Sequence, residues 1–288
     1  MQGIINVYKE VGMTSFDVIA KLRKILNEKK IGHTGTLDPN ATGVLPICIG
    51  AATKFVPYIM SLNKQYLATI KLGIQTDTGD ITGKIINQHN TLDLNIKDIE
   101  YVVNSFIGKI QQKPPMYSAI KINGQKLCNL ARKGIEVERP LREVEIFDIS
   151  ILTYDKENSI LTLKIDCSKG TYIRTLAEDI CFKLNTIGTL ISLERTKTGS
   201  FSKETAHTLS DIANSVNNNG IDNILINIED LFIDYPKINL DEEKYFHYVN
   251  GLKISNNNED GLYAVYVNKK FIGLGEIHNN LLKRKHVI

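Results

Sequence analysis

Alternating hydrophobic and polar positions predict several antiparallel strands. Residues 65–73, QYLATIKLG, alternate strictly and indicate a strand with one buried face. Two further alternating segments, VEIFDISILTY and SILTLKIDCS, lie within residues 143–168 and are separated by DKEN, which predicts a hairpin. The unbroken apolar run at residues 44–49 predicts a buried strand, and residues 3–8 predict a terminal strand. Near the carboxyl terminus, GLYAVYVN and KFIGLGEI meet at a tight turn and predict a small β-rich module.

Apolar residues at helical spacing predict helices between these strands. The first is expected to follow Thr14, an N-cap with Asp17 three residues later, and to end near Lys30. Its expected buried face is Phe16, Ile19, Leu22 and Leu26. Further helices are predicted over residues 52–60, 95–106, 125–133 and 171–184. Long antiparallel pairs mixed with helices favour an α+β fold, with a mixed, largely antiparallel central sheet, over a doubly wound parallel sheet.

A change in composition after Phe201 suggests how the chain divides. Asn-rich segments occupy residues 215–223 and 255–260 and are expected to be loops or linkers. We therefore predict a large domain over residues 1–230 and a small C-terminal module over residues 235–288.

Charge is distributed unevenly, although the net charge is only +3. Residues 109–142 contain eight Lys and Arg against two Glu, whereas residues 208–260 contain ten acidic residues against three Lys. This polarity suits a chain whose first two thirds face phosphate groups, although ordinary solvated surfaces explain the charges equally well.

Composition narrows the class of protein. No apolar run is long enough to span a bilayer, and the amino terminus resembles a strand and not a targeting segment, so a cytoplasmic protein without a membrane partner is expected. The four cysteines are far apart, with no CxxC pair and no Cys/His cluster. We therefore expect a reducing compartment and no metal site built on these cysteines.

The segment GHTGTLDPNATG, residues 32–43, is the strongest candidate for chemistry. Its three glycines allow close backbone approach to a ligand, and Pro39 restricts Asp38 to an extended conformation, which suits a pre-positioned nucleophile or base. An Asp-Pro turn is the structural alternative. A phosphate-binding loop is disfavoured because Val44, and not Lys followed by Ser or Thr, comes after Gly43.

A second acidic pair, Asp77 and Asp80, lies in the turn-rich segment TDTGDITG. A divalent-metal site that supports phosphoryl transfer is one interpretation. Turn and cap formation is the favoured one, because two carboxylates three residues apart have no third ligand nearby.

The motif GHTGTLDPNATGVLPICIGAATKF resembles the catalytic motif of the bacterial tRNA pseudouridine(55) synthases, the family called pseudouridine synthase B (TruB), which is related to guide-RNA enzymes such as dyskerin. Five more blocks resemble this family in the same order. They are GIINVYKEVGMTSFDVI, QYLATIKLGIQTDTGD, QKPPMYSAIKINGQKLCNLARKG, SKGTYIRTLAEDI and SLERTKTGSF. The chain departs from the usual family residue at Glu10, Asn40, Cys181 and Asn185, none of which has a chemical role by this resemblance.

This resemblance implies the pseudouridine synthase fold and conversion of a uridine in the tRNA T loop to pseudouridine, without metal or coenzyme. It implies that Asp38 is the catalytic carboxylate, that Arg174 pairs with it and that Tyr172 handles the proton at C5 of the base. Tyr66 is expected to stack on the base and Leu193 to close the pocket, with His33 and Lys54 at its RNA-facing rim. The insertion over about residues 109–142 is expected to clamp RNA through a basic stretch comprising Tyr117, Lys121, Lys126, Arg132 and Lys133.

We expect a monomer that acts on the tRNA T stem-loop without guide RNA, because the chain has no Lys-rich tail and only a modest charge. A guide-RNA-dependent relative remains the close alternative. A tRNA-binding folding factor that does not need catalysis is the alternative from another class.

Overall fold

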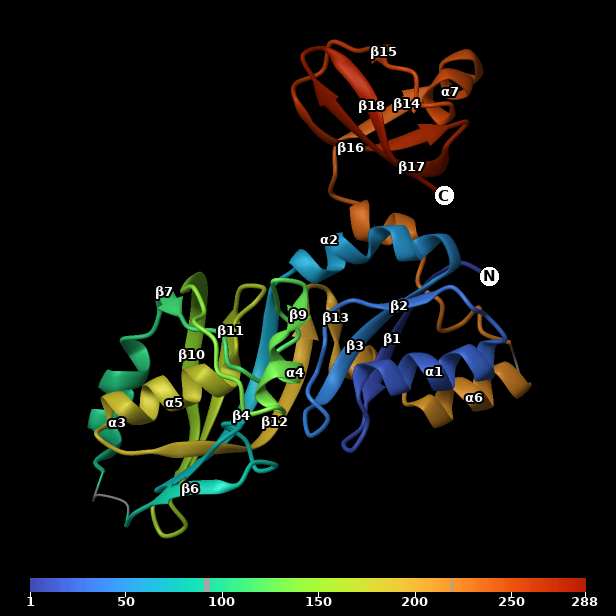
Figure 1. Ribbon diagram of the computed structural model, residues 1–288. Coiled ribbons are helices and arrows are strands. Elements are labelled where there is room, and N and C mark those ends of the chain that lie inside the picture. Colours follow the sequence, from blue (N-terminus) through green and yellow to red (C-terminus); the bar gives the residue numbers. More distant parts are fainter. Residues whose placement is uncertain (91–93, 219) are drawn as a thin grey trace.

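The structure is a computed structural model, and it describes residues 1–90, 94–218 and 220–288. A nine-stranded mixed sheet forms the main body (Figure 1). Neighbouring strands are antiparallel except β12 and β3, which run parallel. The strands follow the order β1 (Gly3–Lys9), β3 (Thr42–Ile49), β12 (Gly188–Thr198), β4 (Lys64–Leu72), β11 (Ile160–Cys167), β10 (Arg142–Asp155) and β7 (Gly108–Gln112), while β2 (Ile31–His33) pairs with β3 and β13 (Phe201–Ser202) with β12. The predicted α+β class is confirmed.

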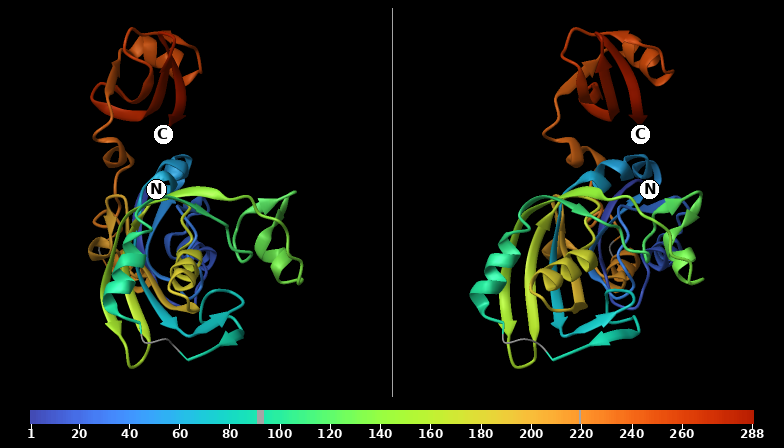
Figure 2. Two further views of the ribbon diagram at one scale, coloured as in Figure 1. Left: turned by 90° about the vertical axis from the view of Figure 1, so that its left-hand side faces the viewer. Right: turned by 60° about the vertical axis from the view of Figure 1, so that its left-hand side comes forward.

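Helices pack against both halves of this sheet (Figures 1 and 2). Helix α5 (Ile173–Lys183) packs against β12 and β4, and α3 (Ile96–Asn104) packs against β10. At the other end, α1 (Ser15–Leu26) and α6 (Leu209–Asn218) pack together beside β1 and β2. No helix in the described parts of the chain is both long and apolar enough to cross a membrane.

Two small hairpins project from the main body. One pairs β5 (Ile74–Thr76) with β6 (Ile85–Gln88). The other pairs β8 (Lys121–Ile122) with β9 (Gln125–Lys126) and leads into α4 (Leu127–Ala131), in the arm between β7 and β10 that extends away from the sheet in the left view of Figure 2.

The C-terminal residues form a separate five-stranded sheet, visible at the top of Figure 1. Its strands have the order β14 (Lys237–Leu240), β16 (Gly261–Val267), β17 (Lys270–His278), β18 (Leu281–Val287) and β15 (Ile254–Ser255), with α7 (Glu242–Val249) beside them. Aromatic rings join this sheet to the main body: Phe232, in the 3₁₀ helix η3 (Ile228–Phe232), lies 6.0 Å from Phe271 and 5.5 Å from Phe55, between ring centroids.

Helix α1 begins as predicted but differs from its prediction in its end and in its buried face. The capping box of Thr14 and Asp17 is present, but the helix ends at Leu26, where Asn27 adopts a left-handed conformation. Phe16 is 63% exposed, so its expected place on the buried face is wrong. Ser15 takes that place, because its hydroxyl bonds the backbone of Leu37 and an adjacent residue points about 100° away around the helix.

Three other local predictions needed correction. Helix α4 is shorter than residues 125–133, because Asn123 and Gly124 both have positive φ and turn β8 into β9. The helix predicted at residues 52–60 is a 3₁₀ helix, η1 (Gly50–Phe55), followed by α2 (Val56–Ser61). The first part of the Asn-rich segment, residues 215–218, completes α6 and is not a loop, while Asn219 lies outside the described residues.

Gly43 permits the close parallel contact between β3 and β12. Its φ is +107°, and a Cβ there would lie 2.2 Å from the Arg195 carbonyl oxygen. We expect Gly43→Ala to lower the free energy of unfolding by about 3 kcal/mol or more, measured by urea titration. Gly12→Ala is the control, because Gly12 also has a positive φ, +84°, but apart from its chain neighbours no described residue comes within 4 Å of its added Cβ, and it should cost only about 1 kcal/mol. Equal losses would contradict the proposed overlap.

Candidate active site

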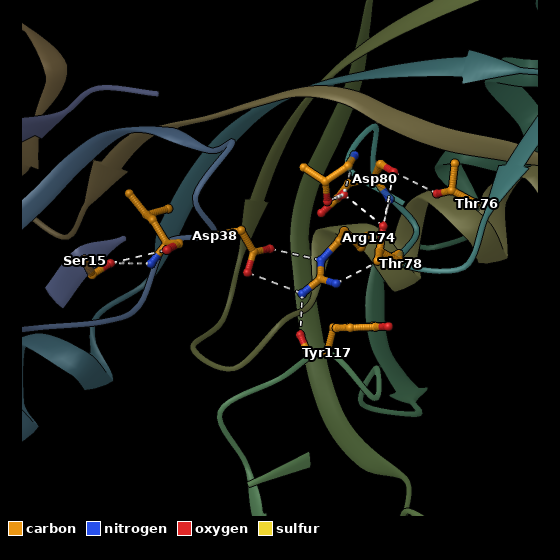
Figure 3. Close-up of polar contacts among 9 residues, drawn as sticks. Ser15, Asp38, Thr76, Thr78, Asp80, Tyr117 and Arg174 are labelled. Carbon is orange, nitrogen blue, oxygen red and sulfur yellow. Dashed lines mark hydrogen bonds and ion pairs between the residues drawn. The ribbon is translucent and has the colours of Figure 1, made fainter. Parts of the chain in front are cut away.

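Asp38 and Arg174 form an ion pair next to Tyr117 of the arm (Figure 3). The Arg174 Nε lies 3.0 Å from Asp38 Oδ2, and Arg174 Nη2 lies 3.4 Å from Asp38 Oδ1. The remaining guanidinium donors bond backbone carbonyls, Nη1 to Thr78 at 2.9 Å and Nη2 to Tyr117 at 2.7 Å. Because these four contacts come from three separate segments, the guanidinium plane is fixed relative to the carboxylate.

The loop that bears Asp38 is anchored on both sides of that residue. The Ser15 hydroxyl accepts from the Leu37 N–H at 2.9 Å and donates to the Leu37 carbonyl at 3.3 Å. The Pro39 carbonyl accepts from the Gly12 N–H at 2.9 Å and from Lys9 Nζ at 3.2 Å. Asp38 is therefore held by the start of α1 and the end of β1, as its predicted role as a fixed group requires.

Two opposing effects act on the Asp38 carboxyl. Burial raises its pKa above the ordinary value, and the neighbouring charge of Asp80 acts in the same direction. The Arg174 guanidinium lowers this pKa, and so does the more distant Lys9. The carboxyl side chain remains 36% exposed and Arg174 only 7%. The guanidinium thus favours the ionised form of a carboxyl group that still faces open space.

A cavity of about 270 Å³ lies beside this pair. It is lined by side chains from the Asp38 loop, β4, the arm, the start of α5 and β12. Among them are five predicted site residues, namely Asp38, Arg174, Tyr66, Tyr172 and Leu193. Tyr66 is 9% exposed on β4, and Leu193 is partly buried on β12. Burial raises the pKa of both tyrosines, which favours their protonated phenols.

His33 and Lys54 lie outside this lining. His33, on β2, is half-buried, and its Nδ1 accepts from the Gly35 N–H at 3.3 Å. Burial lowers the pKa of His33, and the charge of Arg195 adds to that effect. Lys54, in η1, donates to the Val287 carbonyl of the C-terminal sheet. His33 thus contacts backbone of the loop beside the cavity, and Lys54 contacts backbone at the joint between the two sheets.

The four predicted RNA-binding cations lie together on the exposed arm: Lys121 and Lys126 on the β8–β9 hairpin, and Arg132 and Lys133 directly after α4. The same arm contributes the Tyr117 carbonyl that bonds Arg174. The arm is therefore in direct contact with the site.

Asp77 and Asp80 bond to their own loop. Asp80 Oδ1 accepts from the Thr82 N–H and the Thr78 hydroxyl, both at 2.9 Å, and Asp77 Oδ1 accepts from the Lys84 N–H at 2.8 Å. Within residues 1–90, 94–218 and 220–288, no group of three His, Cys, Asp or Glu side chains is arranged to hold a metal ion. The loop instead supports Arg174 through the Thr78 carbonyl (Figure 3).

The structure also places three residues at the site that the sequence analysis did not select: Gln112, Lys64 and Arg195. Lys64 had a detectable signal, because it is two residues from Tyr66 in an alternating strand and must share its face. Arg195 and Gln112 are buried polar residues whose partners are mainly backbone groups, which leave no pattern in the sequence.

Gln112 holds the main chain of Tyr172. It is 1% exposed, its Oε1 accepts from the Tyr172 N–H at 2.7 Å, and its Nε2 donates to the Tyr172 carbonyl at 3.0 Å. Tyr172 is the N-cap of α5, and its own side chain makes no capping hydrogen bond. We expect Gln112→Leu to lower the free energy of unfolding by about 2 kcal/mol, because it leaves the Tyr172 N–H without its partner, although the Tyr172 carbonyl still accepts from the Leu176 N–H at 3.0 Å. Gln111→Leu, on the exposed side of β7, should change the free energy of unfolding by less than about 0.5 kcal/mol in the same urea titration. Equal effects of the two substitutions would mean that the Gln112 hydrogen bonds do not hold the main chain of Tyr172.

One cavity thus brings together a carboxylate, a fixed guanidinium and two tyrosines, groups that can act as nucleophile, base or acid. Comparisons with known proteins define the class as pseudouridylate synthase. Residues 23–173 match the family described as "TruB family pseudouridylate synthase (N terminal domain)". Residues 174–232 match "tRNA pseudouridylate synthase B C-terminal domain", and residues 236–288 match "Pseudouridine synthase II TruB, C-terminal".

The particular family follows from the same matches. The chain belongs to the TruB family, as its motifs predicted. A relative from Clostridium tetani, named tRNA pseudouridine synthase B, is 46% identical over 284 residues, which cover 96% of each chain. A relative of the same name from Clostridium perfringens strain 13 is 42% identical, over 96% of this chain and 95% of its own.

Solved structures agree on the fold. A structure described as a Cbf5-Nop10-Gar1 complex matches with a TM-score of 0.72 and 27% identity, covering 95% of this chain and 78% of the other. An H/ACA RNP bound to a substrate RNA containing 2′-deoxyuridine matches with a TM-score of 0.71 and 25% identity, covering 95% and 77%.

Proposed function

We propose that this protein converts the uridine at position 55, in the T loop of tRNA, to pseudouridine, with Asp38 as the catalytic carboxylate. The relatives named tRNA pseudouridine synthase B support tRNA as the substrate. The observation that carries the catalytic assignment is the Asp38–Arg174 pair at 3.0 Å, on the wall of a cavity that also exposes Tyr66 and Tyr172.

The reaction is an isomerisation. The bond between N1 of uracil and C1′ of ribose breaks, the base turns, and C5 bonds to C1′. The proton on C5 is then lost and N1 gains one, so the reaction has no redox change and no net hydrolysis. The ionised Asp38 can start this reaction by adding to the ring or the sugar, or by removing a sugar proton. Arg174 favours that ionised form.

The other cavity residues have separate roles in this proposal. Tyr66 stacks on the uracil ring, and Leu193 contacts the opposite side. Tyr172 lies at the start of α5, and burial raises the pKa of its phenol, so we infer that it relays the C5 proton: its oxygen accepts that proton while its own hydroxyl proton passes to solvent. A base within its stack cannot enter a cavity among buried side chains, so the target nucleotide must be everted from the loop.

RNA contacts extend from the cavity in two directions. On one side, the arm presents Lys121, Lys126, Arg132 and Lys133 to phosphate groups. On the other side, His33 and Lys54 lie near the joint with the C-terminal sheet. We propose that residues 1–230 form the catalytic domain, that residues 235–288 contact RNA, and that the protein acts as a cytoplasmic monomer without guide RNA or cofactor.

The direct test is incubation of the purified protein with an unmodified tRNA transcript, without guide RNA or added metal, followed by chemical mapping of pseudouridine. We expect one modified nucleotide, at position 55, and the same yield with a chelator present. A transcript with cytidine at that position is the control and should stay unmodified. A requirement for added guide RNA, or modification elsewhere in the tRNA, would overturn the proposal.

A further inference from the structure

The cavity wall contains two buried cations that the proposed reaction does not use. Lys64 is 7% exposed on β4, and Arg195 is 2% exposed on β12. Both residues line the same cavity as Asp38. Their strands are adjacent, with Arg195 directly opposite Tyr66.

The partners of these cations are uncharged. Lys64 Nζ donates to the carbonyls of Met60 at 2.6 Å and Leu62 at 2.5 Å. Arg195 donates to the carbonyls of Val44 at 2.7 Å and Gly35 at 3.2 Å. Among the described residues, neither cation lies within 4.0 Å of a carboxylate. Arg174 differs in this respect, because Asp38 balances its charge.

An unbalanced buried charge is costly. Carbonyl groups satisfy its hydrogen bonds but supply no opposite charge. Burial lowers the pKa of Lys64 to about 8, and the charge of Arg195, the strongest of its neighbours, acts in the same direction. A ligand that brings a negative charge into the cavity would remove this cost, which makes the position a binding-site candidate.

The position of Lys64 indicates which part of a ligand it meets. On β4, Lys64 and Tyr66 point to the same face, and two residues of strand place them roughly 7 Å apart. Asp38, Arg174 and Leu193 also line an adjoining small pocket that Lys64 does not line, whereas Lys64 bonds the Met60 carbonyl and lies opposite Cys167 on β11. A nucleotide whose base stacks on Tyr66 and whose ring or sugar meets Asp38 therefore has an adjoining phosphate group left for the Lys64 end.

We propose that Lys64 and Arg195 form an anion subsite that binds the phosphodiester group adjoining the uridine in the cavity. This inference rests on the proposed function, because it assumes that the occupant is a nucleotide of RNA. Lys64 has a third ammonium proton available to a phosphate oxygen, since two are used by Met60 and Leu62. Arg195 lies opposite Tyr66 on the neighbouring strand, next to the ring that receives the base in the proposed function.

The test removes one charge from each side and measures binding. Each T stem-loop RNA with a neutral methylphosphonate is compared with an RNA that has the ordinary charged phosphate at the same linkage. One such pair alters the linkage 5′ of the target uridine and another the linkage 3′ of it. In both RNAs of a pair the nucleoside before that linkage is 2′-deoxy. We expect the wild-type Kd to rise about tenfold for one of the two neutral linkages. Lys64→Met should raise the Kd of the charged RNA about tenfold, and the neutral linkage should then add less than about twofold.

Lys71→Met is the matched control. Lys71 lies at the other end of β4, and its Nζ also donates to a backbone carbonyl, that of Asn158, but it does not line the cavity. This variant should retain the full loss caused by the neutral linkage. If Lys64→Met and the neutral linkage each raise the Kd by the same factor whether or not the other change is present, Lys64 does not contact that linkage and the proposal is wrong.

A second test uses only the wild-type protein, so a folding defect in a variant cannot affect it. If it binds both methylphosphonate RNAs as tightly as their charged counterparts, the subsite does not exist. Conversion of an unmodified RNA is measured in parallel, so that a failure of the proposed function appears as lost conversion and a failure of the subsite as unchanged Kd. Should Lys64→Met fold poorly, Lys64→Arg, which keeps the charge, should restore sensitivity to the neutral linkage.

Discussion

Asp38→Asn should abolish pseudouridine formation, lowering the single-turnover rate on the order of 10⁴-fold or more. Asparagine has nearly the same shape and still accepts a hydrogen bond from Arg174, which lies 3.0 Å from Asp38 Oδ2. It is neutral, however, and can neither add to the base or sugar nor take up a proton. Transfer RNA should bind with a Kd within about threefold of the wild-type value, because phosphate contacts supply most of such affinity.

Two measurements check this result, the rate with protein in excess over tRNA and the Kd by filter binding. Asp77→Asn is the matched control, since its Oδ1 accepts from the Lys84 N–H at 2.8 Å and asparagine can do the same. It should keep activity within about threefold of wild type. An active Asp38→Asn protein would exclude the proposed mechanism. Loss of activity in Asp77→Asn alone, together with inhibition by a chelator, would favour the metal-dependent alternative.

The main sheet could be predicted because its strands carry their burial pattern in the sequence. Residues 65–73 alternate, and β4 alternates in burial from Lys64 to Leu72. The two segments within residues 143–168 form the β10–β11 hairpin for the same reason. The buried face of α1 was harder to predict. Phe16 fits the apolar spacing, but the buried position belongs to Ser15, whose hydroxyl bonds the backbone of Leu37.

The site was predictable to the extent that a family motif marks it. Asp38 and Arg174 are 136 residues apart, and periodicity cannot bring them together. The resemblance predicted their pairing, and the parallel contact of β3 with β12 shows how the sheet positions the Asp38 loop. Gln112, Lys64 and Arg195 were missed because residue type alone places Gln, Lys and Arg on the surface. Gln112 and Arg195 bond main-chain groups of distant segments, whereas Lys64 bonds the carbonyls of Met60 and Leu62 just before it in the chain.

Arg174→Met should lower the single-turnover rate about 10³-fold, and Arg174→Lys about 10²-fold. Methionine removes the charge that counteracts the rise in the Asp38 pKa caused by burial. Lysine keeps a charge but cannot bond Asp38, Thr78 and Tyr117 together as the planar guanidinium does. Both variants should still bind tRNA, because the exposed cations of the arm remain.

The pH dependence distinguishes lost charge from lost shape. Arg174 lowers the pKa of Asp38 against the raising effect of burial, so its removal raises that pKa further. The reaction needs the ionised carboxylate, and the rate of Arg174→Met should therefore fall at a higher pH than the wild-type rate as pH decreases. Arg174→Lys should show a smaller displacement in the same direction. Arg23→Met, an exposed arginine on α1, is the control and should leave both rate and profile unchanged. If Arg174→Met is slow but its rate falls at the same pH as the wild-type rate when pH decreases, Arg174 acts on substrate geometry and not on the ionisation of Asp38.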